Sequence, residues 1–333
     1  MVKMLRRIVA LKLWLVFTRL RFKLIPMDEN IYDRDSKHSL MAGYAAMSVV
    51  TVLIIIKILA YAASGSVSIL SSLIDSVIDS FVSIAALMSI YYARRPADED
   101  HRWGHGKMEA ISALFQSAVI LSGGAFLVFE AVNRLFDPHP VKAQMLGVYV
   151  MVFSIVASMA LVWLQRLSLK KRESLAVEAD SAHFGSDIII NAGVLLVLLA
   201  GHYGAPAWID PVFALGVAGF MAVLARSIAG KAINMIMDRE LPDEERSKII
   251  GVIEAHDGVI GWHDLRTHRN GPYRVISFDM EADGELSLRA AHAIARDIEE
   301  GILQVFPASE ILIHIDPAGD TDDARHRVKG VHH

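Results

Sequence analysis

Four side chains that could bind a metal ion stand at helical spacing inside long apolar stretches. Asp75 and Asp79 are four residues apart, as are His183 and Asp187. Each pair therefore lies on one face of a helix, with Cβ atoms roughly 5–6 Å apart. An aspartate at the centre of a membrane helix costs about 3 kcal/mol, so these acids need a partner. The pattern predicts either a metal site or buried acids that are satisfied by serines or by Lys57.

Together these four side chains would supply three carboxylates and one imidazole from two helices. Four N/O ligands in a tetrahedral arrangement suit Zn²⁺, and Fe²⁺, Cd²⁺, Co²⁺ and Mn²⁺ are compatible with the same donors. Three unpaired anions in a medium of low dielectric are strongly unfavourable, so either a divalent cation or protons must neutralise them. We therefore predict zinc or another divalent transition metal as substrate, exchanged for protons that compete for the same ligands.

Six apolar stretches are long enough to carry these residues through a membrane. The chain has 333 residues, of which 53% are hydrophobic and 21% are charged, whereas an ordinary soluble domain has about 45–50% apolar residues. A helix needs about 20 mostly apolar residues to cross the bilayer core, and runs of this length are too long for barrel strands. The predicted spans are Leu40–Ser64, Val67–Tyr92, Met108–Phe136, Gln144–Leu167, Ala176–Tyr203 and Ile209–Met237.

Basic residues are concentrated in alternate connections between the spans. Nine Lys and Arg precede the first span, and the second and fourth connections have four each, whereas the first and fifth have none. Because Lys and Arg favour the cytoplasmic side, both termini are predicted to be cytoplasmic. The basic segment 1–37 has no signal-peptide pattern. It is interpreted either as a helix in the headgroup layer or as an extension that precedes a working start at Met27.

After the sixth span the composition becomes that of a small α+β domain. A helix is expected from Asp243 to about His256, strands at Val259–His268 and Tyr273–Glu281, a helix at Ser287–Phe306 and a strand at Ile311–Asp316. The fold class is thus a polytopic α-helical membrane protein with six transmembrane helices at 38–238, followed by a cytoplasmic α-β-β-α-β domain at 239–317. The polar tail, 318–333, is predicted to be loose.

Metal-binding residue types also occur outside the spans. His101 and His105 follow Asp98 in the connection between spans two and three, and this group predicts either a metal site or a solvated polar loop. Alternation in the last predicted strand turns His314 and Asp316 to the same polar face. Asp279 takes the polar face of the second strand, either as a ligand or as an ordinary exposed acid.

Several classes of protein are excluded or disfavoured. The chain has no cysteine, which rules out disulfides, thiolate zinc sites and catalytic thiols. A net charge of −4 gives no basic surface for nucleic acid. No GxxxxGK(S/T) loop supports an ATP-driven pump, and no HExxH helix supports an intramembrane metalloenzyme. A membrane-anchored metal sensor or scaffold is a further alternative, but it would need only the cytoplasmic residues and not the intramembrane acids.

The sequence resembles the cation diffusion facilitator family, particularly its bacterial zinc and ferrous-iron efflux branch. The resemblance covers about residues 38–317. The segments that carry it are Gly65–Leu70, Asp75-Ser-Val-Ile-Asp79, His101-Arg-Trp-Gly-His105-Gly-Lys107, His183-xxx-Asp187, Leu241–Arg246 and His263–Thr267.

This resemblance implies a homodimeric, proton-coupled exporter that works by alternating access in the lipid bilayer of the bacterial inner membrane. It also implies a metallochaperone-like C-terminal domain that holds the metal as a structural ion. The transport site of the family maps onto Asp75, Asp79, His183 and Asp187, a set typical of zinc/cadmium members. A second site, with a structural or regulatory role, maps onto Asp98, His101 and His105.

Two further features of the family map onto the cytoplasmic side of this chain. A lysine–aspartate interlock would join Lys107 to Asp238, unless these are two unrelated juxtamembrane charges. The family also places a two-metal site at the dimer interface of the cytoplasmic domain. The matching positions are His263, Asp279, His292, His314 and Asp316. Asp279 stands where a histidine is typical, which makes this site richer in oxygen donors.

Overall fold

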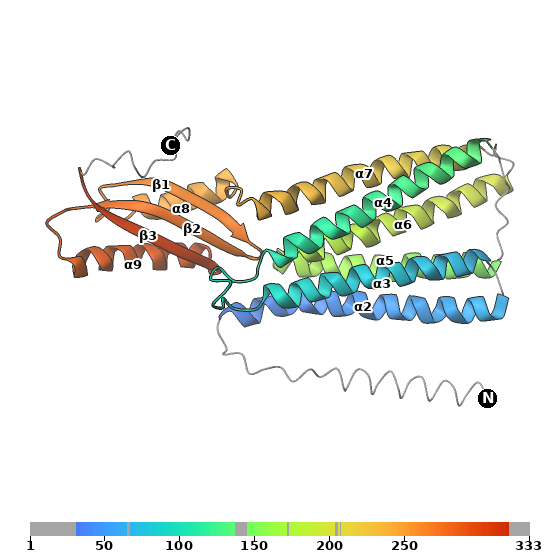
Figure 1. Cartoon of the computed structure of the whole chain (residues 1–333), viewed down its shortest axis with the longest axis horizontal. Coiled ribbons are helices and arrows are strands. Elements are labelled where there is room, and N and C mark those ends of the chain that lie inside the picture. Colours follow the sequence, from blue (N-terminus) through green and yellow to red (C-terminus); the bar gives the residue numbers. More distant parts are fainter. Residues whose placement is uncertain are drawn as a thin grey trace, which may run out of the picture. The chain divides into compact units, whose positions relative to one another are not determined.

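The computed structural model describes residues 31–64, 67–136, 145–171, 173–203, 206 and 208–319 (Figure 1). Ser36–His333 forms one compact unit, separate from Met1–Asp35, and it holds every predicted site residue. The predicted basic segment at 1–37 lies outside the described residues except for its end, which is helical. The predicted tail at 318–333 lies outside them from residue 320 onward.

Six long helices form the N-terminal part of the described chain, as the sequence predicts. They are α2 (Ile31–Ser64), α3 (Val67–Ala93), α4 (Met108–Phe136), α5 (Met145–Lys171), α6 (Leu175–His202) and α7 (Ile209–Ile236). The main difference from the predicted boundaries is that α2 begins at Ile31 rather than Leu40. In the described residues, five of these helices, all except α6, are long and apolar enough to cross a membrane.

The helix α6 combines full length with an unusually polar face. It contains 28 residues, as many as α7, and a helix of 20 residues already spans about 30 Å. Its polar residues include Asp180, His183 and Asp187, which are the side chains that the sequence places toward a site. It has helix neighbours on several sides, because α6 contacts α3, α4, α5 and α7.

Small and branched side chains allow these helices to pack closely. Buried residues of α4, α6 and α7 form one cluster that includes Ala113, Ala179 and Ala225. Small residues let helix backbones approach one another, which is the usual basis of helix association in membranes. Phe184 of α6 belongs to a second cluster, with Val50 of α2. The two clusters hold α6 at the centre of its neighbours, so its polar face meets other helices.

The C-terminal domain has the predicted α-β-β-α-β order. Its elements are α8 (Asp243–Glu254), β1 (Gly261–Asn270), β2 (Tyr273–Ala282), α9 (Leu288–Val305) and β3 (Ser309–Pro317). The sheet order is β1-β2-β3, with β1 antiparallel and β3 parallel to β2. A parallel pair requires a crossover connection, and α9 supplies it. Side chains of β2 such as Phe278 and Met280 are buried with residues of α8 and α9, which leaves the other face of the sheet open.

The turn between β1 and β2 meets the connection that leads into α4. Asn270 donates a hydrogen bond from Nδ2 to the carbonyl oxygen of Trp103. Gly106 approaches this turn so closely that a Cβ atom added to it would lie 2.2 Å from the carbonyl oxygen of Asn270. Gly271 completes the turn with a φ of 61°, a left-handed conformation that glycine adopts without strain.

Candidate functional site

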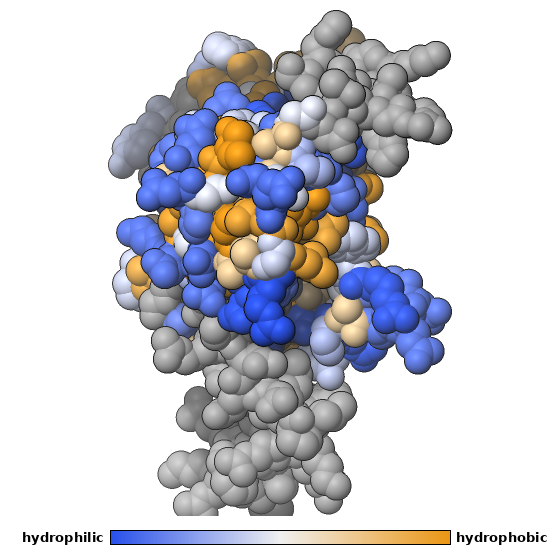
Figure 2. All heavy atoms as spheres, turned by 90° about the vertical axis from the view of Figure 1, so that its left-hand side faces the viewer, coloured by the Kyte–Doolittle hydropathy of each residue, from blue (hydrophilic) through white to orange (hydrophobic). Residues whose placement is uncertain are grey.

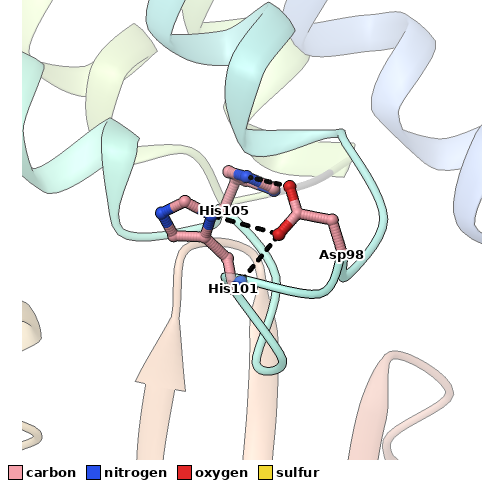
Figure 3. Close-up of side chains that lie close together, drawn as sticks. All are labelled: Asp98, His101 and His105. Atoms are coloured by element: carbon pink, nitrogen blue, oxygen red, sulfur yellow. Dashed lines mark hydrogen bonds and ion pairs between the residues drawn. The ribbon is translucent and has the colours of Figure 1, made fainter.

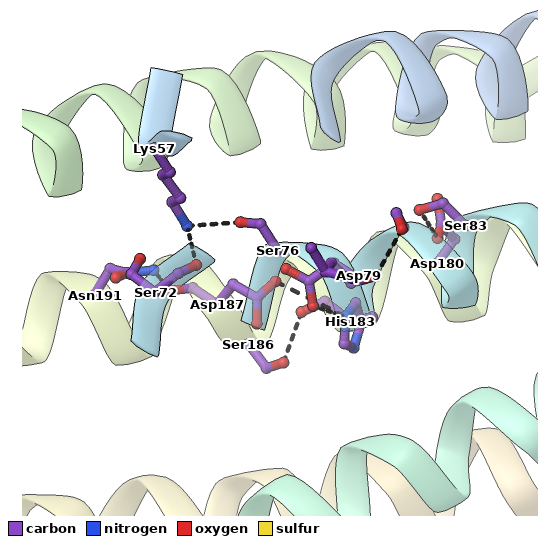
Figure 4. A network of polar contacts seen from close by, with 12 residues as sticks. Lys57, Ser72, Ser76, Asp79, Ser83, Asp180, His183, Ser186, Asp187 and Asn191 are labelled. Carbon is purple, nitrogen blue, oxygen red and sulfur yellow. Dashed lines mark hydrogen bonds and ion pairs between the residues drawn. The ribbon is translucent and has the colours of Figure 1, made fainter. Parts of the chain in front are cut away.

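A three-residue cluster of metal-binding type lies between α3 and α6 (Figure 4). His183 Nε2 is 3.1 Å from Asp79 Oδ1 and 3.9 Å from Asp187 Oδ2. One ligand atom from each side chain lies within 4.8 Å of the other two. The helical period puts His183 and Asp187 on one face of α6, and the packing of α3 against α6 brings Asp79 to them. Side chains that are 104 residues apart in sequence thus gather at one point.

The histidine of this cluster is the most enclosed of its members. Its side chain is 8% exposed, against 20% for Asp79 and 26% for Asp187. His183 Nδ1 is buried and has no hydrogen-bond partner in the described structure. Nε2 is therefore the nitrogen that faces the carboxylates. A cation bound at this point would have two oxygen donors and one nitrogen donor, which is a donor set that suits zinc and its neighbours.

Asp75 is the one predicted transport ligand that the structure leaves outside the cluster. It lies one turn from Asp79 on α3, and its side chain is exposed. Lys57 of α2, the alternative partner of the acids, donates hydrogen bonds to the Ser72 carbonyl at 2.9 Å and to Ser76 Oγ at 2.6 Å. The structure therefore brings together three of the four predicted ligands.

Asp180 is a buried carboxylate next to this cluster that was not predicted as a site residue. Its side chain is 2% exposed. It accepts a hydrogen bond from Ser83 Oγ of α3 at 3.3 Å (Figure 4). It accepts a second one from Gln165 Nε2 of α5 at 2.6 Å. The sequence does carry a signal for it. Asp180 lies three residues before His183, and its partners Ser83 and Gln165 are polar residues within the apolar helices α3 and α5. The hydrogen bonds tie α3, α5 and α6 together beside the cluster.

The predicted loop residues also lie together (Figure 3). Asp98 Oδ1 accepts a hydrogen bond from the backbone N–H of His101 at 2.6 Å and lies 3.1 Å from the Nδ1 atom of the same residue. Asp98 Oδ2 lies 3.3 Å from His105 Nε2. The backbone hydrogen bond from His101 is the main cause that lowers the pKa of Asp98. The group offers one carboxylate and two imidazoles at a site open to water.

The predicted interlock residues form an ion pair. Lys107 Nζ is 2.8 Å from Asp238 Oδ1 and 2.9 Å from Oδ2. Asp238 has a φ of 55°, an uncommon conformation for a residue with a side chain, and it is the second residue after α7. His268 Nε2 lies 3.5 Å from the same carboxylate. The pair therefore joins the start of α4 to the end of α7.

The third cluster lies on the open face of the cytoplasmic sheet. His263 Nε2 is 3.8 Å from Asp279 Oδ2 and 3.9 Å from Asp316 Oδ2. The strand register explains this arrangement, because His263 is the cross-strand partner of Asp279. Burial raises the pKa of Asp279, and the neighbouring His263 and His314 oppose that shift. Three side chains from three strands again offer one nitrogen and two oxygen donors.

The two other histidines predicted for this site lie at its edge or outside it. His314 Nε2 is 3.1 Å from Asp316 Oδ1, and its side chain is 69% exposed. His292 has an exposed side chain on α9, which packs on the core face of the sheet. Sequence reasoning missed Glu281, whose Oε1 atom is 3.6 Å from His263 Nδ1. Glu281 lies two residues after Asp279, and strand alternation could have placed both on the same face.

Comparison with known families agrees with this geometry. A family described as "Cation efflux transmembrane domain" matches residues 44–237. A second family, described as "Cation efflux protein, cytoplasmic domain", matches residues 241–318. The chain belongs to the cation efflux family. The resemblance noted in the sequence is thereby confirmed, and the C-terminal domain is the family's cytoplasmic domain.

Curated relatives of this cation efflux protein carry the same description. The cation-efflux pump FieF of Cronobacter sakazakii is 41% identical over 276 residues, which are 83% of this chain and 92% of the relative. The pump of the same name from Yersinia enterocolitica is 38% identical over 285 residues, which are 86% of this chain and 95% of the relative. This chain is therefore a multi-pass cation efflux pump, a transporter and not an enzyme.

Solved structures similar to this cation efflux protein cover about a quarter of the chain. The metal-bound C-terminal domain of the CzcD transporter from Thermotoga maritima is 29% identical, and the match covers 24% of this chain and 93% of that one with a TM-score of 0.23. The zinc form of the putative zinc transporter CzrB is also 29% identical, with 26% and 98% covered and a TM-score of 0.24.

Proposed function

We propose that this cation efflux pump exports a divalent metal ion, with zinc the best fit to its donors, in exchange for protons. The observation that supports this proposal is the cluster of Asp79, His183 and Asp187 between two helices of a membrane protein. Two carboxylates and one imidazole suit Zn²⁺, and Fe²⁺, Cd²⁺ and Co²⁺ are compatible with the same donors. In the proposal Asp75, one turn away on α3, supplies the fourth ligand when metal is bound.

The proposed cycle is alternating access around this cluster. With the site open to the cytoplasm, the carboxylates and His183 bind the metal and release protons. The helices then tilt so that the site faces outside, where protons rebind to the same atoms and displace the metal. Unneutralised carboxylates are costly in low dielectric, so each state of the cycle needs either a metal ion or protons. This requirement couples the two fluxes.

We further propose that the pump is a homodimer in the bacterial inner membrane, with both termini in the cytoplasm. The face that Figure 2 shows is largely hydrophilic, with a central group of apolar side chains. Leu312 of β3 is 60% exposed, close in sequence to His314. Within one chain the sheet separates His292 from the cluster at His263, so in this proposal His292 reaches the cytoplasmic metal site of a partner subunit.

The decisive experiment measures metal-for-proton exchange in proteoliposomes under an imposed pH gradient. Zinc, iron, cadmium, cobalt and manganese are compared as substrates. We expect Asp79→Ala and Asp79→Asn to reduce flux to the level of protein-free vesicles while the protein still folds and dimerises. Ser80→Ala is the matched control, because Ser80 Oγ donates only to a carbonyl of its own helix. Undiminished flux in both Asp79 variants would refute the proposed site.

A further inference from the structure

His263 is flanked by carboxylates on both sides of its imidazole ring. Its Nε2 atom faces Asp279 and Asp316 at 3.8 and 3.9 Å. Its Nδ1 atom faces Glu281 Oε1 at 3.6 Å. Both nitrogens are buried, and neither has a hydrogen-bond partner in the described structure. The ring therefore lies among three carboxylates and is not hydrogen-bonded to any of them in the described structure.

The chemistry of imidazole makes the two sides of the ring unequal. A neutral imidazole has one N–H donor and one lone pair, whereas an ionised carboxylate only accepts hydrogen bonds. The lone pair repels carboxylates unless a cation stands between them. On the side of Asp279 and Asp316, two carboxylates and the lone pair of Nε2 can share a divalent cation. On the other side, the single carboxylate of Glu281 can accept the proton of Nδ1.

We propose that Glu281 is a positioning residue for the cytoplasmic metal site. In the proposal, Glu281 turns to close the 3.6 Å gap to His263 Nδ1, accepts the Nδ1–H and thereby presents the lone pair of Nε2 to a divalent cation bound with Asp279 and Asp316. Metal-binding histidines commonly donate their other N–H to a carboxylate in this way, which fixes the tautomer and the orientation of the ring. The inference rests on metal binding by the cytoplasmic domain in the proposed function, and it does not depend on transport.

The backbone of Glu281 is held by the sheet, while its carboxylate has room to move. The carbonyl oxygen of Glu281 accepts a hydrogen bond from the backbone N–H of Ile260 at 2.9 Å. Its cross-strand partner is Gly261, where an added Cβ atom would lie 3.1 Å from Glu281 Oε2. The carboxylate thus lies over a residue that has no side chain. This leaves it room to turn toward His263, which is two residues further along β1.

The test measures metal affinity at the cytoplasmic site of the full-length protein in detergent. An Asp79→Ala, His101→Ala background removes ligands from the other two clusters, so the assay does not depend on transport. In this background Co²⁺ is titrated by visible absorption, and Zn²⁺ is added in competition. We expect Glu281→Ala to weaken binding roughly 10- to 100-fold. Glu281→Gln should recover most of the loss, because its carbonyl oxygen still accepts the Nδ1 proton.

Two further measurements separate positioning from direct ligation and from general damage to the fold. The Co²⁺ spectrum at saturation should be the same with and without Glu281, since the ligands are unchanged. Nitrogen NMR of ¹⁵N-histidine in the metal-free protein should show His263 protonated at Nδ1, and Glu281→Ala should abolish this preference. Glu310→Gln, which replaces a strand glutamate on the same open face, is the control and should leave all three measurements unchanged.

Each opposite result overturns the proposal. Unchanged affinity in Glu281→Ala would show that Glu281 does not support the site. A changed Co²⁺ spectrum would make Glu281 a direct ligand, and a proton found on Nε2 would contradict the assigned tautomer. If cobalt does not bind this background at all, while His263→Ala is equally inert, the cytoplasmic site itself is refuted. Loss of transport in Asp79→Ala would remain a separate result.

Discussion

At the scale of single residues, the three clusters differ chiefly in their access to water. His183 is almost fully enclosed, His263 is partly buried, and the Asp98 carboxylate lies at the open surface. Water stabilises an exposed carboxylate by itself, whereas a buried one must find a cation, a proton or several hydrogen-bond donors. In the proposed function the same residue types therefore depend on a bound metal to different degrees, the intramembrane cluster most and the loop cluster least.

Asp279 should make the stability of the metal-free cytoplasmic domain depend on pH. Burial raises its pKa above the usual 3.8, so the folded domain holds this proton more tightly than the unfolded chain does. Stability therefore falls as pH rises from the unfolded pKa through the folded one. We expect Asp279→Asn to reduce this loss, and also to reduce the rise in Tm on adding zinc.

The measurement is thermal unfolding with and without zinc over a series of pH values from about 4 to about 7. Asp257→Asn serves as the matched control, since it replaces an exposed acid of the same domain. An unaltered pH dependence in Asp279→Asn would assign the effect to other groups. An unaltered zinc-induced shift in Tm would remove Asp279 from the metal site.

At the scale of elements, the polar face of α6 carries two groups of side chains with different contacts. His183 and Asp187 turn toward α3 to form the cluster. Asp180, one turn earlier, binds Gln165 and Ser83 and so fixes α6 against α5 and α3. Displacement of α6 relative to its neighbours must break these hydrogen bonds. Asp180 is therefore placed to set the distance between the helices that carry the cluster of Asp79, His183 and Asp187.

Replacing Asp180 by leucine should destabilise the helix bundle. The substitution leaves the amide of Gln165 and the hydroxyl of Ser83 buried without their acceptor, which costs about 1–3 kcal/mol. We expect a lower Tm and reduced flux in proteoliposomes. Replacing both partners, in Asp180→Leu with Gln165→Leu, should restore much of the Tm, because no unsatisfied amide is left. If the double variant is no more stable than Asp180→Leu, the hydrogen bond is not what holds these helices together.

The sequence predicts the helices and strands well, because apolar residues recur along each with the period typical of that kind of element. Met108–Phe136 is a helix from the predicted first residue to the predicted last one, and the α-β-β-α-β order of the cytoplasmic domain is confirmed. Spacing along one element also finds pairs such as His183 and Asp187. It does not fix the rotation of one helix against another, which decides that Asp79 enters the cluster and Asp75 does not.

Contacts between strands cannot be predicted from the sequence for a related reason. Glu281 and Asp279 share a face by simple alternation, but the register that brings His263 opposite Asp279 is a property of the assembled sheet. A bulge between His263 and Arg266 shifts that register, and Asp264 adopts a φ of 53° there. Pairing is set by tertiary structure, so the role of Glu281 emerges only when β1 and β2 are joined.

At the scale of the whole molecule, the ion pair of Lys107 and Asp238 joins the start of α4 to the chain that follows α7. Its members are 39% and 45% exposed, and pairs with this exposure contribute only about 0–1 kcal/mol to stability. The main effect of the pair is therefore to position α4 and α7 and not to raise the free energy of unfolding. It holds Lys107, the residue before α4, beside Asp238, the second residue after α7, where the chain continues to the cytoplasmic domain.

We expect Lys107→Ala to change Tm little but to reduce metal flux, because the ends of α4 and α7 lose their link. Exchanging the charges, in Lys107→Asp with Asp238→Lys, should restore part of the flux. Lys248→Ala is a suitable control, since it breaks an exposed ion pair within α8 alone. A large fall in Tm with unchanged flux would show that the pair supports folding and not transport.

The contact between Gly106 and the turn at Asn270 and Gly271 has a different kind of consequence. Two backbone segments of the chain are in direct contact there, so replacing one side chain by a similar one cannot change their separation. A methyl group at position 106 would push the two segments apart. It would lie 2.2 Å from the Asn270 oxygen, which is more than an ångström closer than a van der Waals contact. Any side chain at position 106 would therefore have to displace the turn at Asn270 and Gly271 from the connection that leads into α4.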